Sequence, residues 1–289
     1  MENNKFAFVI LHYYTVEDTI NCVKSIKELE NYENVEIVIV DNASPNGSGK
    51  EIKEKYKNDE KIHVILSEEN LGFARGNNLG FEYAKKTLNA NFIVLCNNDT
   101  KVLQKDFMSR VENKYKESSC AVIGPKIILK DGTINKLYLK LPTVDEFKKE
   151  ISIFKRNLFC NYLGIESLLR RIKKRIIADK DTSQEEKREE EHQNIILHGC
   201  FWIFTPKYVE VFDGLDNRTF MYREEELLAI RLKKSGLVSI YDPDIEIYHA
   251  EYGSTSAVNK KDRFKRRFFY KNQLKSCEII LEELNNIKG

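Results

Sequence analysis

The chain has 289 residues, with 47 Lys and Arg against 45 Asp and Glu, so its formal net charge is +2. This balance argues against a surface built as a whole for polyphosphate, as in many nucleic-acid-binding proteins, and we expect no nucleic-acid partner. Hydrophobic residues make up 42% of the chain, which holds only 13 Gly and 5 Pro, so whole-chain disorder and collagen-like fibres are excluded.

The apolar runs and the cysteines bear on where the protein works. The apolar run near the N-terminus is too short for the core of a signal peptide, and no small-residue cleavage site follows it. No stretch of about 18 uncharged apolar residues occurs, so no membrane-spanning helix is expected. The six cysteines lie far apart without a CxxC pair, which favours buried free thiols over a disulfide framework or a zinc site. We therefore expect a cytoplasmic protein.

The first hundred residues alternate continuous apolar runs with amphipathic or charged segments. One helix is expected to begin at Thr15, with Asp18 completing a variant capping box, and others after the polar loop at 41–48 and close to Gly72. This β–α alternation with short connections predicts an α/β fold with a mainly parallel central sheet flanked by helices. The runs that predict strands are Phe6–His12, Val35–Val40, Ile62–Leu66 and Phe92–Cys96.

Polar loops follow all four predicted strands. In an open α/β sheet, ligands bind outside the carboxyl ends of the strands. The loops at that edge would be His12–Thr15, Asp41–Ser48, Ser67–Gly72 and Asn97–Asp99. The pattern therefore places a candidate binding site there before any motif is considered.

After residue 100 the pattern is less regular, with shorter strands and isolated helices. The elements expected there are a helix over about 104–116, a strand at 121–123, a hairpin over 126–139 turning at Asp131-Gly132, a strand at 195–205, a short helix opened by Pro206, a helix over 223–234 stopped by Gly236, and short strands at 237–241 and 245–248.

Two segments fall outside this sheet pattern. Residues 141–194 are predicted to be an insertion, with a basic helix pair over 147–177 and then a charge run at 179–193. Residues 259–289 are predicted to be a basic helical tail. Because Lys and Arg are attracted to anionic lipid, we expect the clusters Arg170–Arg175 and Lys260–Arg267 to serve the acceptor or a membrane surface, unless they are solvated helix faces.

Several acidic and neighbouring polar residues at strand ends are candidates for chemistry. Asp99 could bind a divalent cation through oxygen, with Asn97 as an amide or water-mediated ligand, but both could instead begin a turn and cap the next helix. Asp41 could accept from a ring N–H of a pyrimidine base or organise its own Asx turn. His249 could ligate a metal, touch a phosphate or be structural.

Two further patterns carry both a chemical and a structural interpretation. Glu224, Glu225 and Glu226 suit the positive end of a helix dipole, whereas a catalytic interpretation needs one of them as a general base toward a hydroxyl. Gly72, Gly76 and Gly80 lie on one helix face and permit close packing or the approach of a ligand. They are not a GxGxxG fingerprint, and no Walker A motif is present.

Taken in order, these signals resemble a known family. The segments Val38–Ser44, Asn70–Gly80 and Leu95–Thr100 resemble family 2 glycosyltransferases of the GT-A fold, and most of all their bacterial rhamnosyltransferase-like branch. Phe220–Glu225 resembles an aromatic segment with an acidic pair in that branch. The resemblance covers about 6–140 and 195–275, where Tyr241-Asp242-Pro243, Tyr248-His249, Gly253-Ser254 and Tyr270-Lys271-Asn272 also match.

The resemblance implies a role for each candidate residue. Asp41 would contact the nucleotide base, Asp99 would bind Mn²⁺ or Mg²⁺ with Asn97 and His249, and Glu225 would be the base. Glu224 would orient the acceptor or cap the helix. Three departures stand out, namely Asn97 for the first acid of the DxD-type element, Glu225 for Asp, and Leu227 for a further acid. Donor-binding positions implied besides Asp41 are His12, Tyr13, Asn70, Gly72, Arg75, Asn78 and Asn98.

These roles imply an inverting, metal-dependent transfer of a sugar from a nucleotide donor to a hydroxyl. The branch favours L-rhamnose from dTDP-rhamnose, with a UDP-hexose or UDP-galactofuranose as alternatives. The acceptor would be a cell-surface polysaccharide or lipid-linked glycan, reached from the cytoplasmic face of the membrane. Residues 1–258 would form the transferase domain, with a donor-binding half at 1–100 and an acceptor half at 101–258.

Two other classes of protein compete with this interpretation. A nucleotidyltransferase would need a Gly-rich basic loop after the first strand, whereas His12–Thr15 has neither Gly nor Lys. A catalytically degenerate, partner-binding subunit is compatible with the changes at Asn97 and Glu225. Metal-dependent hydrolysis of a nucleotide sugar would separate a dead scaffold from an enzyme.

Overall fold

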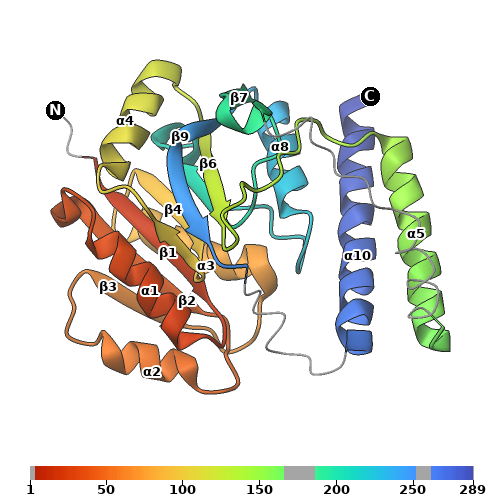
Figure 1. Cartoon of the computed structure of the whole chain (residues 1–289), viewed down its shortest axis with the longest axis horizontal. Helices are drawn as coiled ribbons and strands as arrows, with labels where there is room; N and C mark the ends of the chain where they lie inside the picture. Colours follow the sequence, from red (N-terminus) through yellow and green to blue (C-terminus); the bar gives the residue numbers. More distant parts are fainter. Residues whose placement is uncertain (1–3, 166–185, 252–261, 289) are drawn as a thin grey trace.

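The computed structural model describes residues 4–165, 186–251 and 262–288. A central sheet carries helices on both faces, and a pair of long helices stands beside it (Figure 1). In the described part of the chain the sheet has nine strands, in the order β3-β2-β1-β4-β8-β6-β9-β5, with β7 pairing with β9. The fold is therefore α/β, as the sequence predicts.

The half of the sheet formed by residues 6–97 is parallel. β1 pairs with β2 and β4, and β2 pairs with β3, all in parallel. The parallel register brings His12 opposite Asp41, so the polar loops after β1 and β2 lie together at one edge. The strands are β1 (Phe6–His12), β2 (Val35–Asp41), β3 (Ile62–Leu66) and β4 (Phe92–Asn97), each within one residue of its predicted limits.

Beyond β4 the sheet is mixed. β8 runs antiparallel to both β4 and β6, whereas β6 and β9 are parallel. β5 returns antiparallel to the end of β9, which brings the chain after β4 back to His249. The strands are β5 (Thr100–Val102), β6 (Val122–Leu129), β7 (His192–Gln193), β8 (Phe201–Phe204) and β9 (Ser239–His249).

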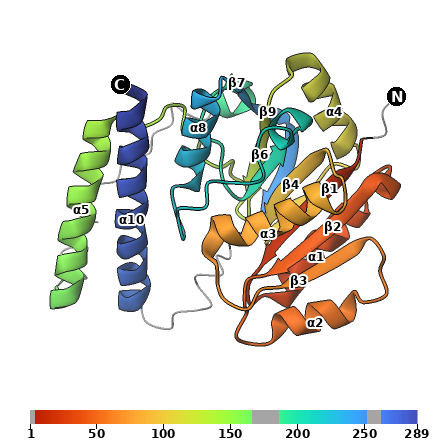
Figure 2. The same ribbon diagram turned by 180° about the vertical axis from the view of Figure 1, so that it is seen from behind.

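Helices cover the sheet on its two faces (Figures 1 and 2). One apolar cluster includes Ile26 of α1 and Phe107 of α4, and the other includes Phe81 of α3 and Tyr208 of α7. All six cysteines are buried and unpaired. The helices are α1 (Val16–Lys27), α2 (Ser48–Lys55), α3 (Gly72–Lys86), α4 (Phe107–Ser118), α7 (Pro206–Val209) and α8 (Glu224–Lys234), with 3₁₀ turns η1 (Tyr32–Asn34) and η3 (Glu186–Glu189).

Two long helices form a separate layer beside α8. α5 (Val144–Leu163) belongs to the predicted insertion and α10 (Asp262–Lys288) to the predicted tail, and they lie side by side in both views (Figures 1 and 2). Together with Leu227 and Ile230 of α8 they bury a third apolar cluster. None of the helices in the described segments is long and apolar enough to cross a membrane.

Several predicted elements differ in the structure. The second arm of the 126–139 hairpin forms only isolated bridges, although the turn itself closes with the Leu129 N–H donating to the Thr133 carbonyl. The predicted strand at 195–205 shortens to β8 because the chain turns at Gly199 and Cys200. The predicted strands at 237–241 and 245–248 are one strand, β9, which continues through an irregular register opposite Pro125 and Lys126.

Other expectations fail locally or fall outside the described segments. The variant capping box at Thr15 does not form, because its hydroxyl accepts from the Asn98 amide instead. Residues Arg170–Arg175, the second predicted helix of the insertion and Lys260-Lys261 lie outside the described residues.

Candidate active site

Asp99 and His249 meet where β4 ends. β5 pairs with β9 so that Thr100 lies opposite His249, and the Ala250 N–H donates to the Asp99 carbonyl. His249 Nε2 lies 3.2 Å from Asp99 Oδ1. His249 Nδ1 is buried without a hydrogen-bond partner among the described residues. Two of the three predicted metal ligands are therefore in contact.

A loop at 198–200 lies against this pair. The Asn97 N–H donates to the Cys200 carbonyl, and the His198 and His249 ring centroids are 6.0 Å apart. Burial and the neighbouring His249 lower the pKa of His198 to about 4, so its ring is neutral near pH 7. Its Nδ1 accepts from the Cys200 N–H, which assigns the ring proton to Nε2.

The three glutamates of α8 diverge. Glu225 accepts from the Gly199 N–H at 3.2 Å. Glu224 accepts from the Thr219 hydroxyl at 2.9 Å, and Glu226 pairs with Arg223 at 2.6 Å. Glu225 is partly exposed, whereas Glu224 and Glu226 are buried. Of the three glutamates, Glu225 alone keeps part of its surface exposed, and its catalytic role stays a prediction.

Carboxylates from both halves of the chain raise the pKa of one buried thiol, that of Cys200. Burial raises the pKa of Cys200, and the charges of Asp99, Glu225 and Glu251 raise it further. Burial also raises the pKa of Glu225. The loop at 198–200 contacts both groups, because His198 lies beside the His249 ring and the Gly199 N–H donates to Glu225.

The turn that precedes α8 is held by a buried guanidinium. Tyr222 and Arg223 both have positive φ, 73° and 75°, which costs free energy for residues other than glycine. The Arg223 guanidinium donates to Glu226, to Glu150 of α5 and to Gln273 of α10 at 2.6–2.7 Å. These contacts fix the start of α8 and join it to the helix pair.

Asp41 is buried at the end of β2, under the start of α2. The Asp41 carboxylate accepts a long hydrogen bond from the Ser44 N–H at 3.3 Å. This contact is the Asx turn that the sequence offered as an alternative to base binding. A Cβ at Gly49 would lie 2.1 Å from Asp41 Oδ2, so only glycine fits there. The close approach places the Asp41 carboxylate against the first turn of α2.

His12 is buried beside this loop and contacts Ser48 at the start of α2. It is fully buried, and its ring nitrogens contact the Thr19 and Ser48 hydroxyls at 2.7 and 2.9 Å. Burial lowers its pKa to about 4. His12 therefore has hydrogen-bond partners for both ring nitrogens within the protein, and its donor contact stays a prediction, while the neighbouring Tyr13 is partly exposed.

Residues of the segment Asn70–Gly80 contact the 215–220 segment and so pack the two halves of the chain together. Gly72 has φ 79°, and a Cβ there would lie 2.0 Å from the Phe220 carbonyl oxygen. Asn78 binds the Leu215 backbone through both its amide oxygen and nitrogen, at 2.7 and 2.9 Å. Arg75 Nε donates to the Asn217 carbonyl at 3.0 Å. Gly72 and Asn78 therefore both make contacts that join the two halves of the chain, and their donor contacts stay predictions.

Asn70 and Asn98 are also engaged in the protein. Asn70 Oδ1 accepts from the Gly72 N–H and the Asn42 amide, although the residue is exposed. Asn98 is buried, and its amide donates to the Thr15 and Thr19 hydroxyls at 2.9 and 3.1 Å. Asn98 thus joins the loop after β4 to Thr15 and Thr19 of the α1 region, and its role as a donor ligand stays a prediction.

Sequence reasoning missed His198, Gly199, Cys200 and Gly49. The signal was a His-Gly pair inside an otherwise apolar run, which an uninterrupted strand would not need. At Gly199 a Cβ would lie 2.9 Å from Glu225 Oε1, so this glycine makes room for the carboxylate. Local pattern gave no reason to connect Gly49 with Asp41.

The donor atoms around Asp99 fit a divalent cation. A carboxylate and an imidazole are ligand types that such ions use, and the unpartnered His249 Nδ1 shows that the imidazole is not fully committed to the protein. The described residues contain no cluster of three or more His, Cys, Asp or Glu side chains that could hold a metal by itself. Any ion here would need further ligands from Asn97, water or a bound phosphate.

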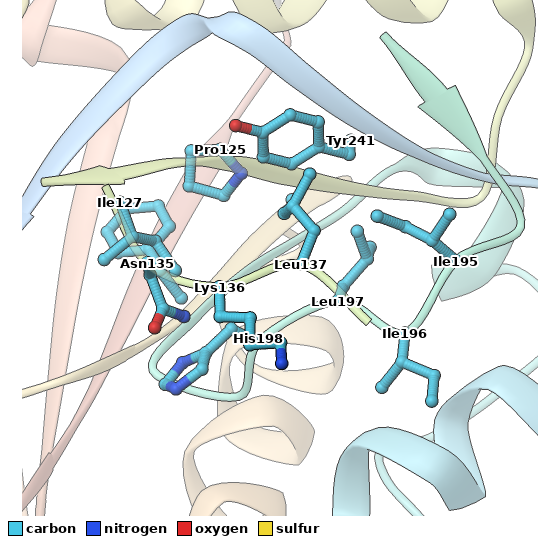
Figure 3. A pocket seen from close by; sticks show the side chains of 12 residues that line it. Pro125, Ile127, Asn135, Lys136, Leu137, Ile195, Ile196, Leu197, His198 and Tyr241 are labelled. Carbon is cyan, nitrogen blue, oxygen red and sulfur yellow. The ribbon is translucent and has the colours of Figure 1, made fainter. Parts of the chain in front are cut away.

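A small hollow adjoins this site on the side of β6. It is mainly apolar and lies between β6, the segment after the 131–132 turn and the segment before Gly199 (Figure 3). His198, Lys136 and Asn135 contribute its nitrogen-bearing side chains, and Tyr241 closes another side. His198 therefore borders both the hollow and the Asp99–His249 pair.

Solved structures identify the architecture as the GT-A fold. TarS residues 1–349 from S. aureus align with a TM-score of 0.53 at 15% identity, covering 98% of this chain and 71% of that one. GalNAc-T7 crystallised with UDP, GalNAc and Mn²⁺ gives 0.59 at 13% identity, over 86% and 44%. The mannosyltransferase PcManGT from Pyrobaculum calidifontis, in complex with GDP-Man and Mn²⁺, gives 0.54 at 12% identity, over 95% and 73%.

The family follows from the sequence match. Residues 8–211 match the family described as Glycosyl transferase family 2, and the chain belongs to this family. It is 27% identical over 126 residues to the low-salt glycan biosynthesis hexosyltransferase Agl10 of Haloferax volcanii, and 30% identical over 120 residues to the putative teichuronic acid biosynthesis glycosyltransferase TuaG of Bacillus subtilis. These matches cover 44% and 41% of this chain, and 38% and 44% of the relatives.

The buried Glu224 predicts a pH dependence of stability. Burial, with the nearby Glu225, raises its pKa to about 8. The folded state then holds a proton that the unfolded state has lost, so stability falls as pH rises from about 5 to 8. Glu224→Gln mimics the protonated acid and should remove part of this decline, on the order of 2–4 kcal/mol. Urea unfolding at pH 5 and pH 8 measures it.

The matched control is Glu210→Gln, which changes an exposed glutamate. Its stability should change with pH in parallel with the wild type. Equal pH slopes for Glu224→Gln and the wild type would show that Glu224 is not held protonated by burial.

Proposed function

We propose that this chain is an inverting glycosyltransferase that moves a hexose from a nucleotide-sugar donor to a hydroxyl of a glycan acceptor. The strongest support is the convergence of the Asp99–His249 pair and Glu225 on the loop at 198–200. The Asp99–His249 pair suits the diphosphate of a donor, and Glu225 suits the hydroxyl of an acceptor. Membership of family 2 supports the same activity.

In this mechanism Glu225 is the general base. It takes the proton of the acceptor hydroxyl as the oxygen attacks the anomeric carbon, and the nucleoside diphosphate leaves from the opposite face. The raised pKa of Glu225 makes it a stronger base than an exposed glutamate once it is ionised. Glu224 and Glu226 are engaged with Thr219 and Arg223, so Glu225 is the one glutamate of α8 left to act as a base, and a single base supports inversion.

Asp99, His249 and Asn97 are the residues proposed to hold the divalent cation. The ion would supply positive charge to the leaving diphosphate. Asp41 is proposed to contact the nucleotide base, with Tyr13 beside it. Asn70 and Arg75 remain proposed donor contacts, since both are exposed beside this edge of the sheet.

The proposed donor is dTDP-rhamnose, and a UDP-hexose or UDP-galactofuranose is the alternative. The rhamnosyltransferase-like motifs at 38–44, 70–80 and 95–100 favour the first. The printed names of the two relatives, a hexosyltransferase of glycan biosynthesis and a putative enzyme of teichuronic acid biosynthesis, support a cell-surface or lipid-linked glycan as acceptor. Such an acceptor would be met at the cytoplasmic face of the membrane.

A donor screen tests the proposal. The full chain is incubated with dTDP-rhamnose, UDP-glucose, UDP-galactose or UDP-galactofuranose, and with Mn²⁺, Mg²⁺ or EDTA, while release of nucleoside diphosphate is measured. We expect metal-dependent hydrolysis of one donor and much weaker hydrolysis of the others. No hydrolysis of any donor, together with binding of none in calorimetry, would favour the degenerate partner-binding subunit.

A further inference from the structure

Exposed apolar side chains gather at one end of the α5–α10 pair. Of the nine large hydrophobic residues exposed in the described segments, five lie at this end. They are between 44% and 64% exposed, far more than a core position allows. They are Phe159, Tyr162, Leu163, Ile165 and Phe264.

The same end is strongly basic. Residues 151–165 and 263–275, here called the basic end, contain eight Lys and Arg and no Asp or Glu, although Asp262 precedes them at the first position of α10. The other acidic residues of the two helices lie toward the opposite end, as at Glu146 and Glu283. The cations of the basic end are Lys155, Arg156, Arg263, Lys265, Arg266, Arg267, Lys271 and Lys275.

The basic end is held rigid by its own contacts. Arg263 donates to the Asn161 and Tyr162 carbonyls at 3.0 and 2.8 Å, closing the last turn of α5. Arg267 donates to Asn161 Oδ1, and its guanidinium stacks 4.1 Å over the Tyr162 ring. The aromatic and basic groups are therefore presented together, at the end of the pair where α5 finishes and α10 begins (Figures 1 and 2).

We propose that the basic end is a docking surface for an anionic lipid membrane. Cations attract the lipid headgroups, while aromatic and aliphatic side chains enter the interface below them. Two copies of the chain would repel each other through surfaces of the same sign. A purely polyanionic partner would leave the five apolar groups in water. The combination of charge and apolar area therefore favours a membrane.

The basic end lies outside the transferase site but is joined to it through Arg223. Arg223 links α8 to Glu150 of α5 and Gln273 of α10, so the docked helix pair and the start of α8 form one rigid unit. A membrane-bound enzyme would then hold Glu225 at a fixed height above the lipid surface. An acceptor carried by a lipid would be met at that height.

Vesicle sedimentation tests the surface directly. The full chain is mixed with vesicles of phosphatidylcholine alone, or with 30% phosphatidylglycerol, a composition chosen as roughly that of an anionic leaflet. We expect binding to the anionic vesicles that weakens as salt screens the charges. Phe159→Ser/Leu163→Ser and Lys265→Glu/Arg266→Glu should each weaken binding by at least about tenfold.

Matched controls lie on the sheet domain. Leu103→Ser/Val211→Ser changes two exposed apolar residues, and Lys50→Glu/Lys53→Glu changes charge by the same amount as the basic-end variant. Both should bind vesicles as the wild type does, and thermal unfolding verifies that every variant is folded. Absence of binding to anionic vesicles, equal binding to neutral ones, or equal losses in the controls would overturn the proposal. Self-association that the basic-end variants abolish, without vesicle binding, would assign the surface to a second copy.

Discussion

Glu225→Gln should lower kcat by at least about 100-fold while leaving the affinity for the nucleotide-sugar donor nearly unchanged. The glutamine keeps the shape of the side chain and can still accept from the Gly199 N–H. It has no basicity, so the acceptor hydroxyl would lose its proton acceptor. Steady-state release of nucleoside diphosphate gives kcat, and calorimetry with the donor gives the affinity.

The pH profile separates a base from a merely structural residue. Burial raises the pKa of Glu225, and only the ionised form accepts a proton. The activity of the wild type should therefore rise with pH through that raised pKa, and the variant should lack this limb. Glu224→Gln is the matched control, because Glu224 is buried against Thr219 and should lose little kcat. Loss of kcat in Glu224→Gln with retention in Glu225→Gln would move the base by one residue.

The four strands β1 to β4 were predictable because burial on both faces of a sheet requires a continuous apolar run. β1 and β3 have the predicted limits, and β2 and β4 each gain one residue. The same rule predicts too long a strand at 195–205. There the apolar run is interrupted by a turn at Gly199, whose N–H donates to Glu225, 26 residues further along the chain. β5 was missed because its three residues carry no pattern and depend on pairing with β9.

In the candidate site, too, some residues could be predicted from the sequence and others could not. Asp99, His249 and Glu225 could be proposed from residue type and motif, and the structure brings the first two into contact. His12, Asn78 and Asn98 are equally polar and equally close to strand ends. Their hydrogen-bonding atoms are taken up by Ser48, by the Leu215 backbone and by Thr15, and such tertiary partners leave no trace in local sequence.

Asp99→Ala should abolish the metal dependence of donor binding. Asp99 is the proposed acidic ligand on the loop after β4, and its contact with His249 places a carboxylate beside an imidazole. Residues that only support a metal ligand change metal affinity by about 10–100-fold, so loss of a ligand should cost at least about 100-fold. Calorimetry with a nucleoside diphosphate, with Mn²⁺ or with EDTA, measures the effect.

The controls decide whether the loss belongs to the metal or to the fold. In the wild type, affinity should fall when EDTA replaces Mn²⁺, whereas Asp99→Ala should bind equally weakly in both. Asp131→Asn, at an exposed turn, should keep the wild-type response. His249→Gln should weaken Mn²⁺-dependent binding in the same direction, because it removes the second contact of the pair. Thermal unfolding of Asp99→Ala should stay cooperative, since its neighbours at β5 and β9 are held by backbone pairing. A Mn²⁺-dependent affinity equal to that of the wild type would remove Asp99 from the donor site.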